Sequence, residues 1–227
     1  MNKLYIIFTL CLILLFGSIY WLESNNPTKD ELGGYSTTLS GRSDEQIINI
    51  NLAAQALDKI FIAPGEVFSF NERVGPYTVA KGYRDAPQIY YGKLIKSIGG
   101  GICQVSSTLY NAALLSNMKI VERKPHNTYV KSVPPGRDAS VALSQTYEAD
   151  LKFRNTSNAP VKIVTDTSNK RLNIRIMGTR FDTEKVDIAT ESPDPSSVNV
   201  YRIITKTGGQ KLRELVSKDK YFKEGLI

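Results

Sequence analysis

One cysteine, one histidine and one aspartate follow each other in an order that could support nucleophilic catalysis. Cys103 stands in the string GGGICQVSSTLYNAALL (99–115), where a helical pattern begins directly after three glycines. A thiol at a helix start lies where the macrodipole favours the thiolate. His126 is the single histidine of the chain, and Asp138 follows it in the string PPGRDA. We therefore predict a catalytic group in which His126 activates Cys103 and Asp138 orients the imidazole.

Residues beside this group are predicted to bind the substrate. The backbone N–H of Cys103 and the side chain of Gln104 could donate hydrogen bonds to a developing oxyanion. Arg137 could bind a substrate carboxylate through two parallel hydrogen bonds. The predicted substrate-binding residues are Gly100, Gly101, Gln104, Ser106, Ser107 and Arg137.

The same residues also fit a structural interpretation. Free cysteine is among the most frequently buried residue types, so Cys103 could simply fill the core. The glycines could let the helix start pack tightly against a strand, and Arg137 with Asp138 could form an ordinary ion pair in a turn. The two interpretations predict opposite shifts of the thiol pKa, because burial alone raises it and a neighbouring imidazolium lowers it.

The composition excludes several other classes of protein. With 41% hydrophobic and 22% charged residues among 227, the chain is typical of a globular protein and not of a disordered one. Two cysteines and one histidine cannot supply four Cys/His ligands to zinc, and we predict no metal and no cofactor. The net charge of +7 favours an anionic binding partner, such as membrane head groups or wall polymers, over nucleic acid. The alternative is that the positive charge only keeps the protein soluble.

The N-terminal segment is predicted to anchor the chain in a membrane. Residues 4–22 are uncharged and mostly apolar, and a helix of that length spans about 28 Å, close to the thickness of a bilayer core. Tyr20 and Trp21 are typical of a membrane interface, and no small-residue cleavage pattern follows. We expect a single-pass protein of the cell membrane with its main domain outside the cytoplasm. A cleaved signal peptide is the alternative.

Helical patterns come first along the rest of the chain and strand patterns follow. Ser43 and Gln46 fit a capping box at the start of one helix, and a second helix is expected over about 103–115. A hairpin is predicted around Gly92 and Lys93, and strands alternate with turns after residue 117. The predicted fold class is α+β, with helices packed on an antiparallel sheet and preceded by one transmembrane helix.

Five strings of the sequence together resemble the VanW family. They are PGEVFSFNERVGP, KGYRDAPQIYYGKL, GGGICQVSSTLYNAALL, IVERKPHN and VPPGRDASVAL…DLKFRN, and they cover about residues 35–180 in the family's order. The family's signature includes the cysteine, the histidine and the PPGRD string, which are matched by Cys103, His126 and Pro134–Asp138. Its members are bacterial envelope proteins, so the resemblance implies action at or near peptidoglycan and a link to vancomycin resistance.

The sequence thus predicts four parts and one leading function. The parts are an anchor over 1–23, a linker over 24–34, a VanW-like domain over 35–180, and a C-terminal β-hairpin with a tail over 181–227. We expect an envelope protein that catalyses acyl transfer or amide hydrolysis on wall peptides, with peptidoglycan or another anionic wall polymer and the membrane as partners. The alternative is a non-catalytic module that binds the wall or a partner protein, with Cys103 as a buried structural residue.

Overall fold

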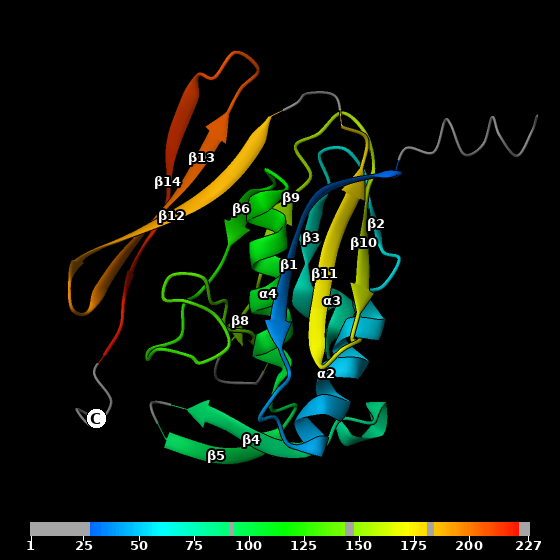
Figure 1. Cartoon of the computed structure of the whole chain (residues 1–227). Helices are drawn as coiled ribbons and strands as arrows, with labels where there is room; N and C mark the ends of the chain where they lie inside the picture. The colour runs from blue at the N-terminus through cyan, green and yellow to red at the C-terminus, as the bar shows by residue number, and fades with distance from the viewer. Residues whose placement is uncertain (1–27, 91–92, 144–147, 181–183, 223–227) are drawn as a thin grey trace, which may run out of the picture.

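The computed structural model describes residues 28–90, 93–143, 148–180 and 184–222, and strands make up most of its regular structure (Figure 1). The helices are α2 (Asp44–Leu57), α3 (Phe70–Val74) and α4 (Ile102–Leu115), with a 3-10 turn at Val79–Lys81. The strands are β1 (Asp30–Thr38), β2 (Phe61–Ile62), β3 (Val67–Ser69), β4 (Asp85–Tyr90), β5 (Lys93–Ile98), β6 (Lys119–Glu122), β7 (Ala142–Leu143), β8 (Glu148–Ala149), β9 (Lys152–Arg154), β10 (Val161–Asp166), β11 (Arg171–Gly178), β12 (Lys185–Asp194), β13 (Ser197–Thr205) and β14 (Lys211–Lys220).

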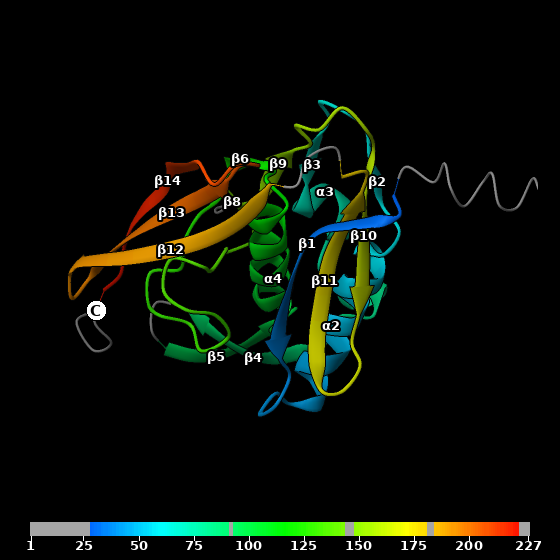
Figure 2. The same cartoon turned by 45° about the horizontal axis from the view of Figure 1, so that its top comes forward.

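The described strands pair into several small sheets. One sheet has the order β1-β11-β10-β2, a second has the order β12-β13-β14, and a third has the order β3-β9-β6. Two further antiparallel pairs join β4 to β5 and β7 to β8. Figure 2 shows the β12-β13-β14 sheet on one side of α4 and the sheet that contains β1 and β11 on the other side.

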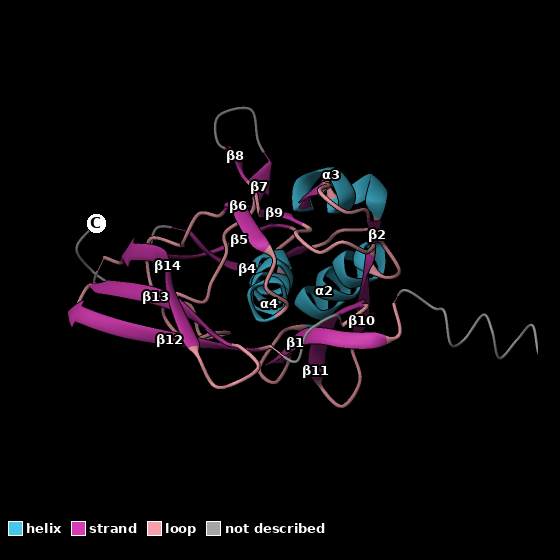
Figure 3. Ribbon diagram, turned by 90° about the horizontal axis from the view of Figure 1, so that it is seen from above, coloured by secondary structure: helices cyan, strands magenta, loops and turns pink. Residues whose placement is uncertain are grey.

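Helix α4 lies at the centre of this arrangement (Figure 3). All of its residues from Gln104 to Leu114 are buried. The helix contacts β1, β11, β6, β12 and α2, so protein surrounds it. A helix that is enclosed in this way needs small or apolar side chains all round, which explains why Ser106, Ser107 and Ala113 occur beside Leu109.

The predicted fold class is wrong. Strands occupy more than twice as many described residues as helices, and they form several sheets instead of one antiparallel sheet covered by helices. Helix α4 contacts strands of three different sheets and also α2, so it does not lie as a layer on one sheet. The transmembrane helix of this prediction falls within residues 1–23, outside the described residues. In the described part of the chain, no helix has the length and hydropathy needed to cross a bilayer.

Several local predictions are confirmed. Ser43 caps α2 and forms the reciprocal capping box with Gln46. Strands β4 and β5 pair antiparallel, as the predicted hairpin requires. Strands β13 and β14 also pair, and Gly208 and Gly209 between them adopt positive φ angles of 96° and 86°. Left-handed backbone of this kind favours glycine, which explains the Gly-Gly pair in that turn.

One boundary lies elsewhere than expected. The linker predicted over 24–34 overlaps β1, because β1 starts at Asp30 and pairs with β11 from that residue onward. Strand β12 runs through Pro193 to Asp194, with a register shift that begins after Glu191. Proline is tolerated in a strand at such an irregularity, so Pro193 does not end β12.

Candidate active site

The structure brings Cys103, His126 and Asp138 together. Cys103 is the second residue of α4, and β6 runs back along the helix (Figure 1). The segment after β6 brings His126 next to Cys103. The Nδ1 atom of His126 lies 2.7 Å from Oδ2 of Asp138, and the backbone N–H of His126 donates to the same oxygen at 2.6 Å. The thiol of Cys103 donates to the carbonyl oxygen of Val141 at 3.5 Å, and the imidazole of His126 lies close enough to lower the pKa of the thiol. This is the order of contacts that a cysteine nucleophile needs.

The pKa values of the three groups shift in directions that favour a thiolate and an imidazolium. Burial raises the pKa of the Cys103 thiol, but the interaction with the imidazole of His126 outweighs burial and brings it below 9.0. Burial lowers the pKa of His126, while the hydrogen bond to Asp138 and the neighbouring Cys103 thiol raise it to about 10. Burial raises the pKa of Asp138, yet His126 and Arg123 hold it below its ordinary value. Cys103 is half-buried and the His126 side chain is 14% exposed, so the pair is partly accessible.

We expect the imidazole of His126 to remain protonated until about pH 10. Because the chain has a single histidine, an NMR titration of a protein without a histidine tag follows one ring signal. Cys103→Ser should lower this pKa, since it removes the thiolate while Asp138 remains. A wild-type midpoint near the ordinary value of 6.5 would contradict the assigned ion pair.

Arg123 is a buried member of the site that the sequence analysis missed. Its Nη2 lies 3.1 Å from Oδ1 of Asp138, and its Nε donates to the Asp138 carbonyl at 2.6 Å. Its side chain is only 4% exposed, and the ring of Tyr110 lies beneath the guanidinium with its centroid 5.2 Å away. The only sequence signal was its place three residues before His126. Together with His126, Arg123 keeps Asp138 ionised.

Two predicted substrate ligands point away from the thiol. The Gln104 amide nitrogen donates to Thr37 Oγ1 at 3.0 Å and to the Thr38 carbonyl at 2.8 Å. Successive helical residues point about 100° apart, so Gln104 faces β1 while Cys103 faces the segment after β6. The Gln104 side-chain oxygen also accepts a hydrogen bond from Arg42. The Arg137 guanidinium donates to the Asn111 side chain and stacks over the ring of Tyr35. For both residues, substrate binding stays a prediction.

Ser106 and Ser107 attach the Asp138 segment to α4. The Ser107 hydroxyl accepts from the Ala139 N–H at 2.9 Å and donates to the Cys103 carbonyl at 2.6 Å. The Ser106 hydroxyl donates to the Ala139 carbonyl at 2.6 Å. Because Ala139 follows Asp138 directly, these bonds fix the carboxylate relative to the start of the helix. Both serines therefore position the site, whereas direct contact with substrate stays a prediction.

The glycines before α4 have a packing role. A Cβ on Gly100 would lie 2.5 Å from the Ala86 carbonyl oxygen. Any residue other than glycine would therefore require β4 to move. Gly101 caps the helix with a positive φ of 104°. These features fit the structural interpretation, in which the glycines let the start of α4 pack tightly against a strand. The lowered thiol pKa fits the catalytic interpretation instead.

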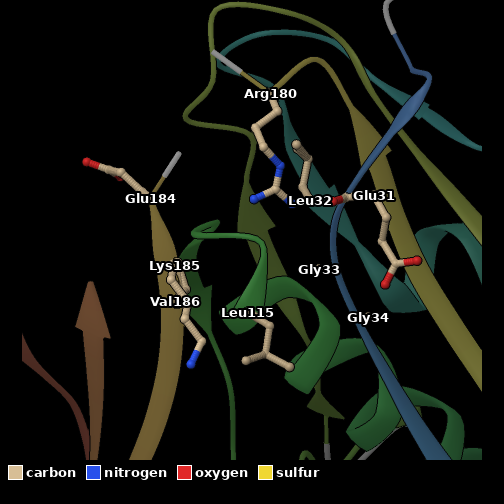
Figure 4. A pocket seen from close by; sticks show the side chains of 9 residues that line it. All are labelled: Glu31, Leu32, Gly33, Gly34, Leu115, Arg180, Glu184, Lys185 and Val186. Atoms are coloured by element: carbon tan, nitrogen blue, oxygen red, sulfur yellow. Dashed lines mark hydrogen bonds between the residues drawn. The ribbon is translucent and has the colours of Figure 1, made fainter. Parts of the chain in front are cut away.

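A hollow of about 310 Å³ lies near the far end of α4 (Figure 4). The residues that line it are Glu31, Leu32, Gly33, Gly34, Leu115, Arg180, Glu184, Lys185 and Val186. Leu115 is the last residue of α4, about 18 Å along the helix from Cys103. The hollow is therefore separate from the three predicted catalytic residues. No cluster of three or more His, Cys, Asp or Glu side chains suited to a metal ion occurs among the described residues.

Comparisons with known proteins point to one family. The family described as VanW like protein matches residues 45–177. The chain is 44% identical over 133 residues to Uncharacterized protein YoaR of Bacillus subtilis strain 168, covering 59% of this chain and 43% of that protein. It is 33% identical over 124 residues to Vancomycin B-type resistance protein VanW of Enterococcus faecalis strain ATCC 700802 / V583, covering 53% and 44% respectively. The chain thus spans less than half the length of these curated relatives. No solved structure matches it.

Proposed function

The chain belongs to the VanW family, as its resemblance to that family implied, and on this premise we propose that it is a thiol-dependent enzyme of the bacterial cell envelope. Its reaction is acyl transfer or amide hydrolysis on wall peptides. One relative is named a vancomycin B-type resistance protein, and we extend the link with that resistance to this chain as part of the proposal.

One observation carries the proposal: His126 is held by a buried carboxylate and lies beside a thiol whose pKa it lowers. Because Nδ1 is 2.7 Å from Asp138, Nε2 is the ring nitrogen that the proposal assigns to Cys103. A structural cysteine needs only apolar neighbours, and burial alone would raise its pKa. The pKa of Cys103 is instead lowered, because a partly exposed imidazolium lies beside it.

The first chemical step follows from this ion pair. The Cys103 thiolate attacks the carbonyl carbon of a peptide bond and forms a C–S bond, while the carbonyl electrons move to oxygen. The backbone N–H of Cys103, at the helix start, is the proposed donor to that oxyanion. When the C–N bond breaks, His126 gives its proton to the leaving amine, and a thioester on Cys103 remains. Asp138 stays ionised and keeps the ring in place.

The second step returns the enzyme to its starting state. The neutral His126 takes a proton from water or from an acceptor amine, and the resulting nucleophile attacks the thioester. The C–S bond breaks, and the thiolate leaves beside the newly protonated imidazolium. Water gives hydrolysis and an amine gives transfer, so one site accounts for both reactions.

The proposed place of action is the outer face of the cell membrane, close to peptidoglycan. The family assignment and the net charge of +7 support this location, because wall polymers carry negative charge. A cationic surface would raise the local concentration of such a polymer near the thiol. No role in nucleic-acid binding is proposed.

Incubation with purified muropeptides should test the enzymatic step. We expect intact-mass spectrometry to detect an acyl adduct on Cys103 and chromatography to detect the released amine. Cys103→Ala should abolish both signals, because the proposed thioester forms on Cys103. If the wild type forms neither adduct nor product, and both proteins bind wall fragments equally, the non-catalytic binding module is the correct function.

A further inference from the structure

The C-terminal sheet extends the site beyond the part of the chain that matches the family. The match ends at residue 177, whereas Asp219 lies near the end of β14 and Tyr221 follows that strand. We infer that Asp219 and Tyr221 are positioning residues, which hold Arg123 and Asp138 so that the Asp138 carboxylate stays aimed at His126. This inference rests on the proposed function, since it assigns the two residues to the same thiol chemistry.

Tyr221 contacts the carboxylate directly. Its hydroxyl donates to Oδ1 of Asp138 at 2.6 Å and accepts from the backbone N–H of Gly136 at 2.7 Å. The side chain is only 2% exposed, so water does not compete freely for these bonds. One hydroxyl therefore ties the carboxylate to the backbone two residues before it. Hydrogen bonds of this kind, to a buried charged group, are among the stronger ones in proteins.

Asp219 acts through Arg123. Its Oδ1 lies 2.5 Å from Nη1 of Arg123, and both side chains are 4% exposed. Arg123 then reaches Oδ1 of Asp138 with its other terminal nitrogen at 3.1 Å. The guanidinium is planar and rigid, so a carboxylate that holds one edge also fixes the direction of the other edge.

The two oxygens of Asp138 have separate partners. Oδ1 receives Tyr221 and Arg123, while Oδ2 receives the backbone and the ring of His126. A carboxylate bonded on both oxygens cannot rotate without losing two charged contacts. The C-terminal sheet thus fixes the orientation of the carboxylate that His126 contacts. Hydrogen bonds from outer residues orient the ligands of metal sites in the same way.

The sheet packs firmly enough on the site for this role. A Cβ on Gly136 would lie 2.6 Å from a methyl group of Val200, so β13 presses on the segment before Asp138. The backbone N–H of Phe222 donates to the carbonyl of Asn127 at 2.7 Å, beside His126. Figure 2 shows this sheet against the long loop that follows β6.

Tyr221→Phe and Asp219→Asn test the inference through the alkylation of Cys103 by iodoacetamide as a function of pH. Both variants should slow alkylation at pH 7 by about tenfold, the effect of one hydrogen bond to a buried charge. The inflection of the pH profile should move upward, because a loosely held imidazolium stabilises the thiolate less. The NMR midpoint of His126 should move downward.

Two matched variants control for general damage to the sheet. Tyr129→Phe removes a hydroxyl that bonds the Pro195 carbonyl, although its ring packs against Tyr221 with centroids 4.7 Å apart. Glu214→Gln removes an ion pair with Arg202 in the same sheet. Both should keep the wild-type alkylation profile and the wild-type His126 midpoint.

The inference is overturned if Tyr221→Phe and Asp219→Asn keep the wild-type profile and His126 midpoint, even when their unfolding temperatures fall. Failure of the proposed function looks different, because the wild-type thiol itself would then lack a low inflection. The His126 midpoint still decides the positioning role in that case.

Discussion

His126→Ala is expected to slow alkylation of Cys103 by iodoacetamide at pH 7 by roughly a hundredfold. Without the imidazolium, burial is the main influence on the thiol and raises its pKa. A thiol with an ordinary or raised pKa is only about a few per cent thiolate, or less, at neutral pH, and only the thiolate reacts. The more basic thiolate is also the better nucleophile, which recovers a small part of the lost rate.

The measurement is a pH series of alkylation rates on the folded protein, read by mass spectrometry of the Cys103 peptide. The wild type should show an inflection below 9.0, which the variant loses. Asn127→Ala is the matched control, because this exposed neighbour lies beside His126 and its side chain takes no part in the site. Equal rates for wild type and His126→Ala at pH 7 would rule out the ion pair.

The same ion pair makes stability depend on pH in two opposing ways. The folded pKa of His126, about 10, exceeds its ordinary value of 6.5, so its contribution is complete below pH 6.5 and is lost as the pH rises to about 10. The folded pKa of Cys103 is depressed, so its contribution is present above 9.0 and is lost as the pH falls through the folded value. The two slopes partly cancel near neutral pH.

The sequence was sufficient to predict that Cys103, His126 and Asp138 lie together, because they occupy strongly marked positions, while their catalytic roles stay a prediction. Three glycines before an apolar helical pattern located Cys103 at the start of α4. The single histidine and the PPGRD turn left few alternatives for the other two members. The short return through β6 then brought the groups together, as a helix followed by a strand allows.

The supporting residues could not be predicted because their contacts join distant parts of the chain. Tyr221 is 83 residues from Asp138, and Asp219 is 96 residues from Arg123. No local pattern reports such a pair. Gln104 and Arg137 are close to Cys103 and Asp138 in sequence, but their hydrogen-bond partners could not be predicted, because the direction of a side chain depends on the helix or turn that carries it. The fold class failed for a related reason, since burial of α4 on all sides depends on strands far along the chain.

The second large effect concerns stability: Asp138→Ala should lower the free energy of unfolding by about 3–5 kcal/mol, as expected when a buried ion pair loses one partner. Asp138 is 1% exposed and accepts hydrogen bonds from Arg123, His126 and Tyr221, so its removal leaves positive charge in the interior with fewer partners. Urea unfolding at pH 7 measures the change, and the slope with denaturant shows whether the transition stays two-state.

Glu122→Ala is the control for Asp138→Ala, because Glu122 forms an ion pair with Lys152 at 3.0 Å in which both side chains are about one third exposed. An exposed pair contributes less than about 1 kcal/mol. The folded pKa of Asp138 lies below 3.8, so its contribution is complete above pH 3.8 and is lost as the pH falls through the folded value. The difference between wild type and Asp138→Ala should therefore shrink in acid. If Asp138→Ala costs no more than Glu122→Ala at pH 7, Asp138 is not the buried electrostatic centre of the site.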